Sequence, residues 1–247
     1  MIEFKNVTKD YDGHLALRNL NLTIQNGEIV GLIGHNGAGK STTIKSLVSV
    51  INPTSGEIII DGQELSANRL AIKKKIGYVA DSPDLFLRLT ANEFWELVAT
   101  AYDMTQSDCE ERLQHLLETF DFADHRYEVI ESFSHGMRQK VFVIGALLSD
   151  PAIWVLDEPM TGLDPQASYD LKQMMREHAD KGNTVLFSTH VLEVAEQLCD
   201  KVAILKKGKL IFYGTIEELK GQHPEQSLET IYLSLAGRRE EVSPDAH

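Results

Sequence analysis

The chain has 247 residues, of which 43% are hydrophobic and 25% are charged, and its formal net charge is −13. This composition predicts a folded globular protein and excludes a disordered chain. No apolar run approaches the ~20 residues of a membrane span, and residues 1–5 lack the apolar core of a signal peptide, so we expect a cytosolic chain. The acidic balance disfavours extended contacts with phosphate backbones, so we expect no nucleic-acid partner.

The first part of the chain predicts an antiparallel sheet. Residues 2–7 and 20–24 alternate apolar and polar side chains with period two, which is typical of half-exposed strands. Tyr11 lies between these segments. Its flat ring can stack on a nucleotide base, and an ordinary turn tyrosine fits the same position, so the spacing leaves both interpretations open.

A glycine-rich segment, residues 34–42, joins a short apolar run at 29–33 to a helical pattern at 40–50. It matches the phosphate-binding loop G-x-x-x-x-G-K-[ST], in which glycines let backbone N–H groups converge on an anion at a helix start. We expect Lys40 to reach the outer phosphates of a nucleoside triphosphate and Ser41 to ligate Mg²⁺. The residues expected to contact the nucleotide here are Asn36, Gly37, Ala38, Gly39, Lys40, Ser41 and Thr42.

The pattern becomes helical from residue 89 to about residue 148. Two capping boxes, each a Ser or Thr followed three residues later by Glu, occur at residues 90–93 and 107–110 and predict helix starts. We therefore expect an inserted helical subdomain at about residues 85–150.

Two acidic residues follow an apolar strand at residues 153–156. Open α/β sheets bind ligands at the carboxyl ends of their strands, so Asp157 and Glu158 are predicted to reach the nucleotide. We expect Asp157 to hold Mg²⁺ and Glu158 to orient or deprotonate the water that attacks the γ-phosphate. A solvated strand end without a ligand is the alternative interpretation.

The rest of the chain alternates predicted strands and helices, which indicates a parallel sheet. The predicted fold is α/β, a P-loop NTPase core with a parallel sheet, an N-terminal antiparallel β subdomain and an inserted helical subdomain. We expect one domain over residues 1–247 that ends in a short C-terminal helix and tail at about 215–247. The predicted strands are residues 57–60, 76–79, 153–156, 184–187 and 202–205, and the predicted helices are residues 165–179, 191–199 and 227–236.

Together these segments resemble the ATP-binding cassette (ABC) subunit of a membrane transporter over nearly the whole chain. The residues that carry the resemblance are 34–42 (Walker A), 134–139 (signature), 153–158 (Walker B), 162–164 (D-loop), 188–190 (H-loop) and the aromatic Tyr11.

The resemblance implies a Mg-dependent ATPase whose cassettes dimerise head to tail, as a homodimer or a heterodimer. Each ATP then lies between the Walker motifs of one subunit and the signature of the other, where Ser134 and Gly136 face the γ-phosphate. His190 is implied to contact the same phosphate. The partner is implied to be a transmembrane permease that holds the chain at the cytoplasmic face of the cell membrane.

Two positions depart from the usual family pattern. The signature reads Phe-Ser-His-Gly-Met at residues 133–137 where LSGGQ is usual, and Asp81 stands where glutamine is common. Both variants resemble those of single-cassette exporters with a separate membrane subunit. Asp81 is either a further metal-site residue or a turn residue.

Two other functions are compatible with the same motifs. One is a non-transport ABC ATPase that acts on nucleic acid or ribosomes, which the acidic single cassette disfavours. The other is an ATP-binding regulatory clamp with weak hydrolysis, which is disfavoured because Lys40, Glu158 and His190 are all present. The leading prediction is an exporter ATPase.

Overall fold

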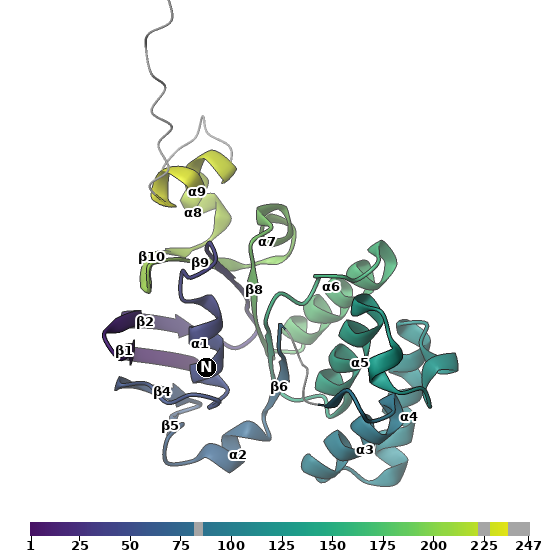
Figure 1. Cartoon of the computed structure of the whole chain (residues 1–247). Helices are drawn as coiled ribbons and strands as arrows, with labels where there is room; N and C mark the ends of the chain where they lie inside the picture. The colour runs from purple at the N-terminus through teal and green to yellow at the C-terminus, as the bar shows by residue number, and fades with distance from the viewer. Residues whose placement is uncertain (82–85, 222–227, 237–247) are drawn as a thin grey trace, which may run out of the picture.

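The computed structural model describes residues 1–81, 86–221 and 228–236. Two β-sheets form its framework (Figure 1). The smaller sheet is antiparallel, as the N-terminal alternation predicted. Its strand order is β2-β1-β4-β5, and its strands are β1 (Ile2–Tyr11), β2 (His14–Ile24), β4 (Ser55–Ile60) and β5 (Gln63–Glu64).

The first hairpin is longer than the sequence pattern predicted. Strands β1 and β2 extend toward a two-residue turn in which Asp12 and Gly13 have φ of 50° and 95°, the geometry that Asp-Gly favours in tight hairpins. The register between the strands shifts at three places. These shifts interrupt the period-two alternation, so the prediction stopped short on both strands. Tyr11 consequently ends β1 and does not lie in the turn.

The larger sheet has the strand order β10-β9-β3-β8-β7-β6, and only the pairing of β10 with β9 is antiparallel. All residues of β3, β7 and β8 are buried, which explains their nearly continuous apolar sequences. Because the parallel strands run the same way, the residues that follow β3, β6, β7 and β8 share one side, here called the carboxyl edge. The strands are β3 (Ile29–Ile33), β6 (Ile76–Val79), β7 (Ile153–Leu156), β8 (Thr184–Thr189), β9 (Lys201–Lys206) and β10 (Lys209–Gly214).

Helices cover both faces of the parallel sheet. Helix α1 (Lys40–Leu47) lies between the two sheets, where Ile44 packs in one core with residues of both. Helix α6 (Pro165–Asp180) covers the other face. It begins after its N-cap Asp164, whose carboxylate accepts the Ala167 N–H at 2.8 Å. The remaining helices of this part are α2 (Arg69–Lys73), α7 (Leu192–Leu198), α8 (Ile216–Gly221) and α9 (Leu228–Ala236).

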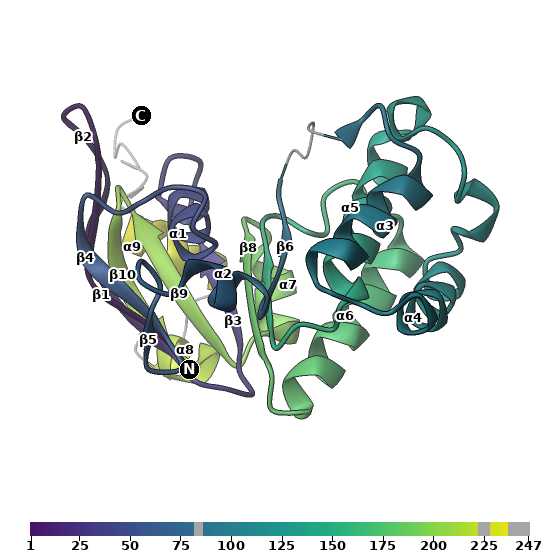
Figure 2. The ribbon, with the colours of Figure 1, turned by 90° about the horizontal axis from the view of Figure 1, so that it is seen from below.

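Three longer helices form a lobe on the far side of β6 from the antiparallel sheet (Figure 2). The predicted capping box at Thr90 and Glu93 is present. The predicted start at Ser107 is wrong, because the Thr105 hydroxyl accepts the Asp108 N–H and the helix begins two residues earlier. That residues of about 85–150 act as a subdomain of their own stays a prediction. The elements are α3 (Ala91–Ala101), α4 (Gln106–Thr119), η2 (Ala123–His125), η3 (Ile130–Ser132) and α5 (His135–Leu148).

The C-terminal helix α9 agrees with the segment predicted at residues 227–236, and its Ile231 is buried against the end of the parallel sheet. Of the helix and tail predicted at about 215–247, residues 222–227 and 237–247 lie outside the described residues. Within the described part of the chain, no helix combines the length and apolar character that crossing a membrane requires.

Candidate functional site

The glycine-rich loop leaves β3 at Gly34 and enters α1 at Lys40. Gly37 and Gly39 have φ of 77° and 112°, a region that residues with a Cβ rarely adopt. A Cβ on Gly39 would also lie 2.9 Å from the backbone oxygen of Ala16. The loop therefore needs glycine at this point both for its backbone conformation and for its contact with β2.

Lys40 is buried, with 6% of its surface exposed, although it carries a charge. Its Nζ donates a hydrogen bond to the Gly34 carbonyl oxygen at 2.7 Å and lies 3.6 Å from Glu158 Oε1. The ammonium therefore sits inside the loop, where an anion bound by the loop would meet it. The other residues predicted to bind nucleotide occupy this loop or the first turn of α1: Asn36, Gly37, Ala38, Gly39, Ser41 and Thr42.

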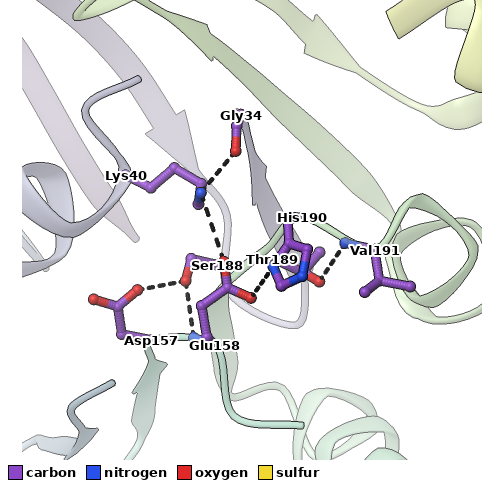
Figure 3. Close-up of polar contacts among 8 residues, drawn as sticks. All are labelled: Gly34, Lys40, Asp157, Glu158, Ser188, Thr189, His190 and Val191. Atoms are coloured by element: carbon purple, nitrogen blue, oxygen red, sulfur yellow. Dashed lines mark hydrogen bonds and ion pairs between the residues drawn. The ribbon is translucent and has the colours of Figure 1, made fainter. Parts of the chain in front are cut away.

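The two predicted carboxylates follow β7 at the carboxyl edge (Figure 3). Asp157 is 1% exposed, and its N–H continues the ladder to the Val79 carbonyl oxygen at 2.9 Å. Glu158 has φ of 50°, a conformation that costs free energy for a residue with a Cβ. The chain turns at Glu158, so adjacent carboxylates leave the strand in different surroundings.

A buried serine links these two carboxylates. Ser188 Oγ donates to Asp157 Oδ1 at 2.5 Å and accepts the Glu158 N–H at 2.9 Å. The sequence placed Ser188 in a motif but assigned it no role. Its partners lie about 30 positions away along the chain, so only the pairing of β7 with β8 brings them together.

His190 follows β8 and completes the group. Its Nδ1 lies 2.9 Å from Glu158 Oε2, and the ring is 63% exposed. The Glu158 carboxylate thus has Lys40 beside one oxygen and His190 beside the other. A carboxylate held between two such groups at the edge of a sheet is suited to binding and orienting a water molecule.

Asp81 follows β6, the strand beside β7, and is exposed. Burial and the negative charges of Asp157 and Asp81 raise the pKa of Tyr78 to about 12, so both carboxylates act on the same phenol. The described residues contain no group of three His, Cys, Asp or Glu side chains that could hold a metal ion. The two predicted metal residues Ser41 and Asp157 still suit Mg²⁺, which usually keeps several waters and phosphate oxygens as ligands. The metal role of Asp81 stays a prediction.

The predicted signature residues begin α5, which lies across the parallel sheet from α1 (Figure 1). Ser134 is the N-cap, and its hydroxyl accepts the Met137 N–H at 3.3 Å. Gly136 has no room for a side chain, because a Cβ would collide with the carbonyl oxygen of Gly162. Helix α5 and helix α1, which begins at Lys40, pack in different cores on opposite faces of the parallel sheet.

The start of α5 is instead tied to the segment that follows Glu158. The His135 ring fills the space beside Gly162, where a Cβ would meet it. Lys140 Nζ lies 2.8 Å from Asp164 Oδ2, and Gln139 Nε2 donates to the Pro159 carbonyl oxygen at 3.3 Å. Hydrogen bonds from Ala167 N–H and from Lys140 hold the pKa of Asp164 below its usual value. Sequence reasoning did not foresee the His135 contact.

Tyr11 is 45% exposed at the end of β1. The Lys9 ammonium lies 4.9 Å from the centre of its ring, a cation–π arrangement, and donates to the Asn52 carbonyl oxygen at 2.9 Å. Stacking of Tyr11 on a base stays a prediction.

Comparisons with known proteins agree with these observations. A family profile described as ABC transporter matches residues 17–161, more than half of the chain. The ABC-type transporter ATP-binding protein EcsA of Bacillus subtilis (strain 168) is 37% identical, over 95% of this chain and 96% of its own length. The Nod factor export ATP-binding protein I of Rhizobium leguminosarum bv. viciae is 36% identical, over 86% of this chain and 68% of its own.

Solved structures agree as well. One described as the ATP binding subunit of an ABC transporter has a TM-score of 0.90 and 35% identity, and covers 95% of this chain and 99% of that one. The dimeric cassette MJ0796, in a post-hydrolysis state bound to ADP and Pi, has a TM-score of 0.80 and 28% identity, and covers 87% of this chain and 99% of that one. The chain therefore belongs to the ABC transporter family, as an ATP-binding subunit with the fold of the ABC ATPases.

Proposed function

We propose that the chain hydrolyses Mg-ATP to drive a membrane exporter, working as one of two cassettes that dimerise head to tail. The observation that carries this proposal is the position of Glu158, held 3.6 Å from Lys40 and 2.9 Å from His190. An ATPase needs a base beside the terminal phosphate, with positive charge and hydrogen-bond donors around it. These side chains supply all three at the carboxyl edge.

In this proposal the loop binds the phosphates and Lys40 turns from Gly34 and Glu158 toward the outer phosphate oxygens. Ser41 and Asp157 would hold Mg²⁺, which would supply positive charge beside the phosphates. Glu158 accepts a proton from the attacking water, or orients it, and His190 donates a hydrogen bond to the γ-phosphate. Tyr11 stacks on the base.

The proposed dimer follows from the separation between the signature residues and the nucleotide-binding loop of the same chain. Ser134 and Gly136 lie on α5, across the parallel sheet from α1, so in this proposal they serve the nucleotide of a second subunit. The N-terminus of α5 then directs its dipole at that phosphate. The dimeric state of the related cassette MJ0796 supports this arrangement.

We further propose that a transmembrane permease holds the dimer at the cytoplasmic face of the membrane. The name of the related Nod factor export protein favours export as the direction. The contacts of Lys40 and His190 with Glu158 favour a hydrolase over a regulatory clamp. The net charge of −13 disfavours a partner made of nucleic acid or ribosomes.

The test starts from the membrane protein that co-purifies with this chain in its native host. The pair is reconstituted into vesicles with the cassette outside, and ATP hydrolysis and movement of solute are measured together. Export predicts ATP-dependent accumulation inside such vesicles. ATP-dependent loss of a preloaded solute would show import, and hydrolysis that no membrane partner stimulates would favour a function outside transport.

A further inference from the structure

The backbone at Glu158 is held in a conformation that it would not adopt by itself. Its φ of 50° lies in the left-handed region, which residues with a Cβ occupy only where the surroundings hold them. The Glu158 N–H donates to Ser188 Oγ at 2.9 Å. The direction in which the Glu158 side chain leaves the sheet therefore depends on a side chain of β8.

Ser188 has the chemistry for this role. It is fully buried, and it follows Phe187, which pairs with the last residue of β7. A hydroxyl has one proton to donate and lone pairs that accept. Here the proton points to Asp157 Oδ1 at 2.5 Å and a lone pair receives the Glu158 N–H (Figure 3). One hydroxyl thus fixes both residues at once.

We infer that Ser188 is a positioning residue for ATP hydrolysis, an inference that rests on the proposed roles of Asp157 and Glu158. It holds the turn at Glu158 so that the carboxylate stays between Lys40 and His190, and it orients Asp157. Without the hydroxyl, a backbone donor and a carboxylate oxygen both lose their partner in a buried site. The turn can then relax, and the Glu158 carboxylate moves away from the attacking water.

ATP binding depends mainly on other groups, because Ser188→Ala leaves the Asp157 carboxylate itself in place to hold Mg²⁺. The phosphates are bound by the loop N–H groups and by Lys40, whose hydrogen bond to Gly34 does not involve β8. Loss of the hydroxyl should therefore lower kcat and leave the affinity for ATP nearly unchanged. A defect that merely loosened the fold would lower both.

The experiment compares the full-length chain with Ser188→Ala and Ser188→Thr. We measure steady-state ATP hydrolysis, binding of a fluorescent ATP analogue and the thermal unfolding midpoint. The matched control is Thr184→Val, which removes another buried hydroxyl on the same face of β8, at its opposite end. Glu158→Gln is measured in the same series.

We expect Ser188→Ala to lower kcat about tenfold or more, the loss that follows when a hydrogen bond to a charged group is removed. Its affinity for the analogue should stay within about twofold. Ser188→Thr, which keeps the hydroxyl, should recover most of the rate, and Thr184→Val should match the original chain. If the added methyl group unfolds the threonine variant, Ser188→Ala tests the inference by itself, through a loss of kcat that is larger than its loss of affinity for the analogue.

Wild-type turnover in Ser188→Ala would overturn the inference, and so would an equal loss of kcat and affinity. The proposed function fails in a different way, because it requires Glu158→Gln to lose hydrolysis whatever Ser188 does. A Glu158→Gln variant with full activity would move the base elsewhere, whereas a dead Glu158→Gln with an active Ser188→Ala would reject only the role of Ser188.

Discussion

The carboxyl edge of the parallel sheet and the start of α5 hold their functional side chains in different ways. At the carboxyl edge, Lys40, Asp157 and Ser188 are buried and bonded to one another or to the backbone. At the start of α5, Ser134 and His135 are exposed. The first region is already organised within one chain. The second turns its donors outward, as expected of a region that serves another subunit's nucleotide.

The largest expected effect is at Lys40. Lys40→Ala removes the buried ammonium from the loop and the cation beside Glu158, so ATP affinity should fall about a hundredfold or more, as charge-assisted bonds to phosphate are lost. Titration with a fluorescent nucleotide measures this. Lys45→Ala, on the exposed side of the same helix, is the control. Unchanged binding by Lys40→Ala would place the nucleotide elsewhere.

Glu158→Gln separates binding from hydrolysis at the same edge. The amide keeps the shape of the side chain and removes the base, so hydrolysis should fall about a hundredfold or more while Mg-ATP still binds. The variant should then accumulate as a dimer when ATP is present, and light scattering with and without ATP detects this dimer. Glu193→Gln, at an exposed position of helix α7, is the control. A Glu158→Gln chain that stays monomeric with bound ATP would argue against the head-to-tail dimer.

Ser134→Arg tests the outward-facing region. A long side chain at the cap of α5 should block hydrolysis by the assembled transporter, because it meets the γ-phosphate of the other subunit. It should leave ATP affinity of the isolated chain within about twofold, since its own loop is untouched. Ser107→Arg, exposed on α4, is the control. Reduced ATP affinity in the isolated chain would mean that the two regions are coupled within one subunit.

The features that depend on neighbouring residues in the chain were predicted from the sequence. The loop before Lys40 and the acids after β7 are set by neighbouring residues, and the fold class built on them is confirmed by the related structures. Contacts between distant segments were not predictable. Ser188 meets Asp157 only through strand pairing, and His135 meets Gly162 only because α5 packs against the D-loop.

The exact start of a helix was also difficult to predict from the sequence. The sequence offered two hydroxyls near the start of α4, and both are followed at three positions by an acidic residue. Thr105 became the cap and Ser107 did not, because the backbone of Thr105 is extended and its hydroxyl accepts the Asp108 N–H, whereas Ser107 already lies within the helix. Register shifts in the first hairpin likewise depend on its partner strand.

A buried histidine packs against β7 away from the carboxyl edge. His178 is 2% exposed and stacks on Trp154 at 3.9 Å. Burial lowers its pKa from 6.5 to about 4, although Asp150 opposes the shift. Below pH 6.5, His178 therefore binds a proton in the unfolded chain but not in the folded chain. The free energy of unfolding falls as the pH drops from 6.5 toward 4.

This gives a prediction of moderate size. The free energy of unfolding should fall by about 2 kcal/mol from this residue alone between pH 7 and pH 5. Urea unfolding at the two pH values measures it, and His178→Gln, which cannot titrate, should lose that part of the change. An equal pH dependence in both chains would show that folding does not lower the pKa of His178. ATP affinity at pH 7 should be the same in both.

The smallest expected effect belongs to His135, which connects the start of α5 to the segment that follows the carboxyl edge. Its ring packs on Gly162, so it touches the segment that leads away from Glu158. Two other ties hold that segment to α5, from Lys140 to Asp164 and from Gln139 to Pro159.

Because these ties remain, His135→Gly should change ATP hydrolysis by the assembled transporter less than about threefold, the effect of a lost surface contact. His135→Gly with Lys140→Ala removes two of the three ties, and its loss should exceed the product of the single losses if they act on one segment. Steady-state ATPase assays of the three variants measure this. If His135→Gly alone loses most activity, the His135 ring has a role in hydrolysis beyond its contact with Gly162. The start of α5 would then be held in place within its own chain, like the side chains at the carboxyl edge.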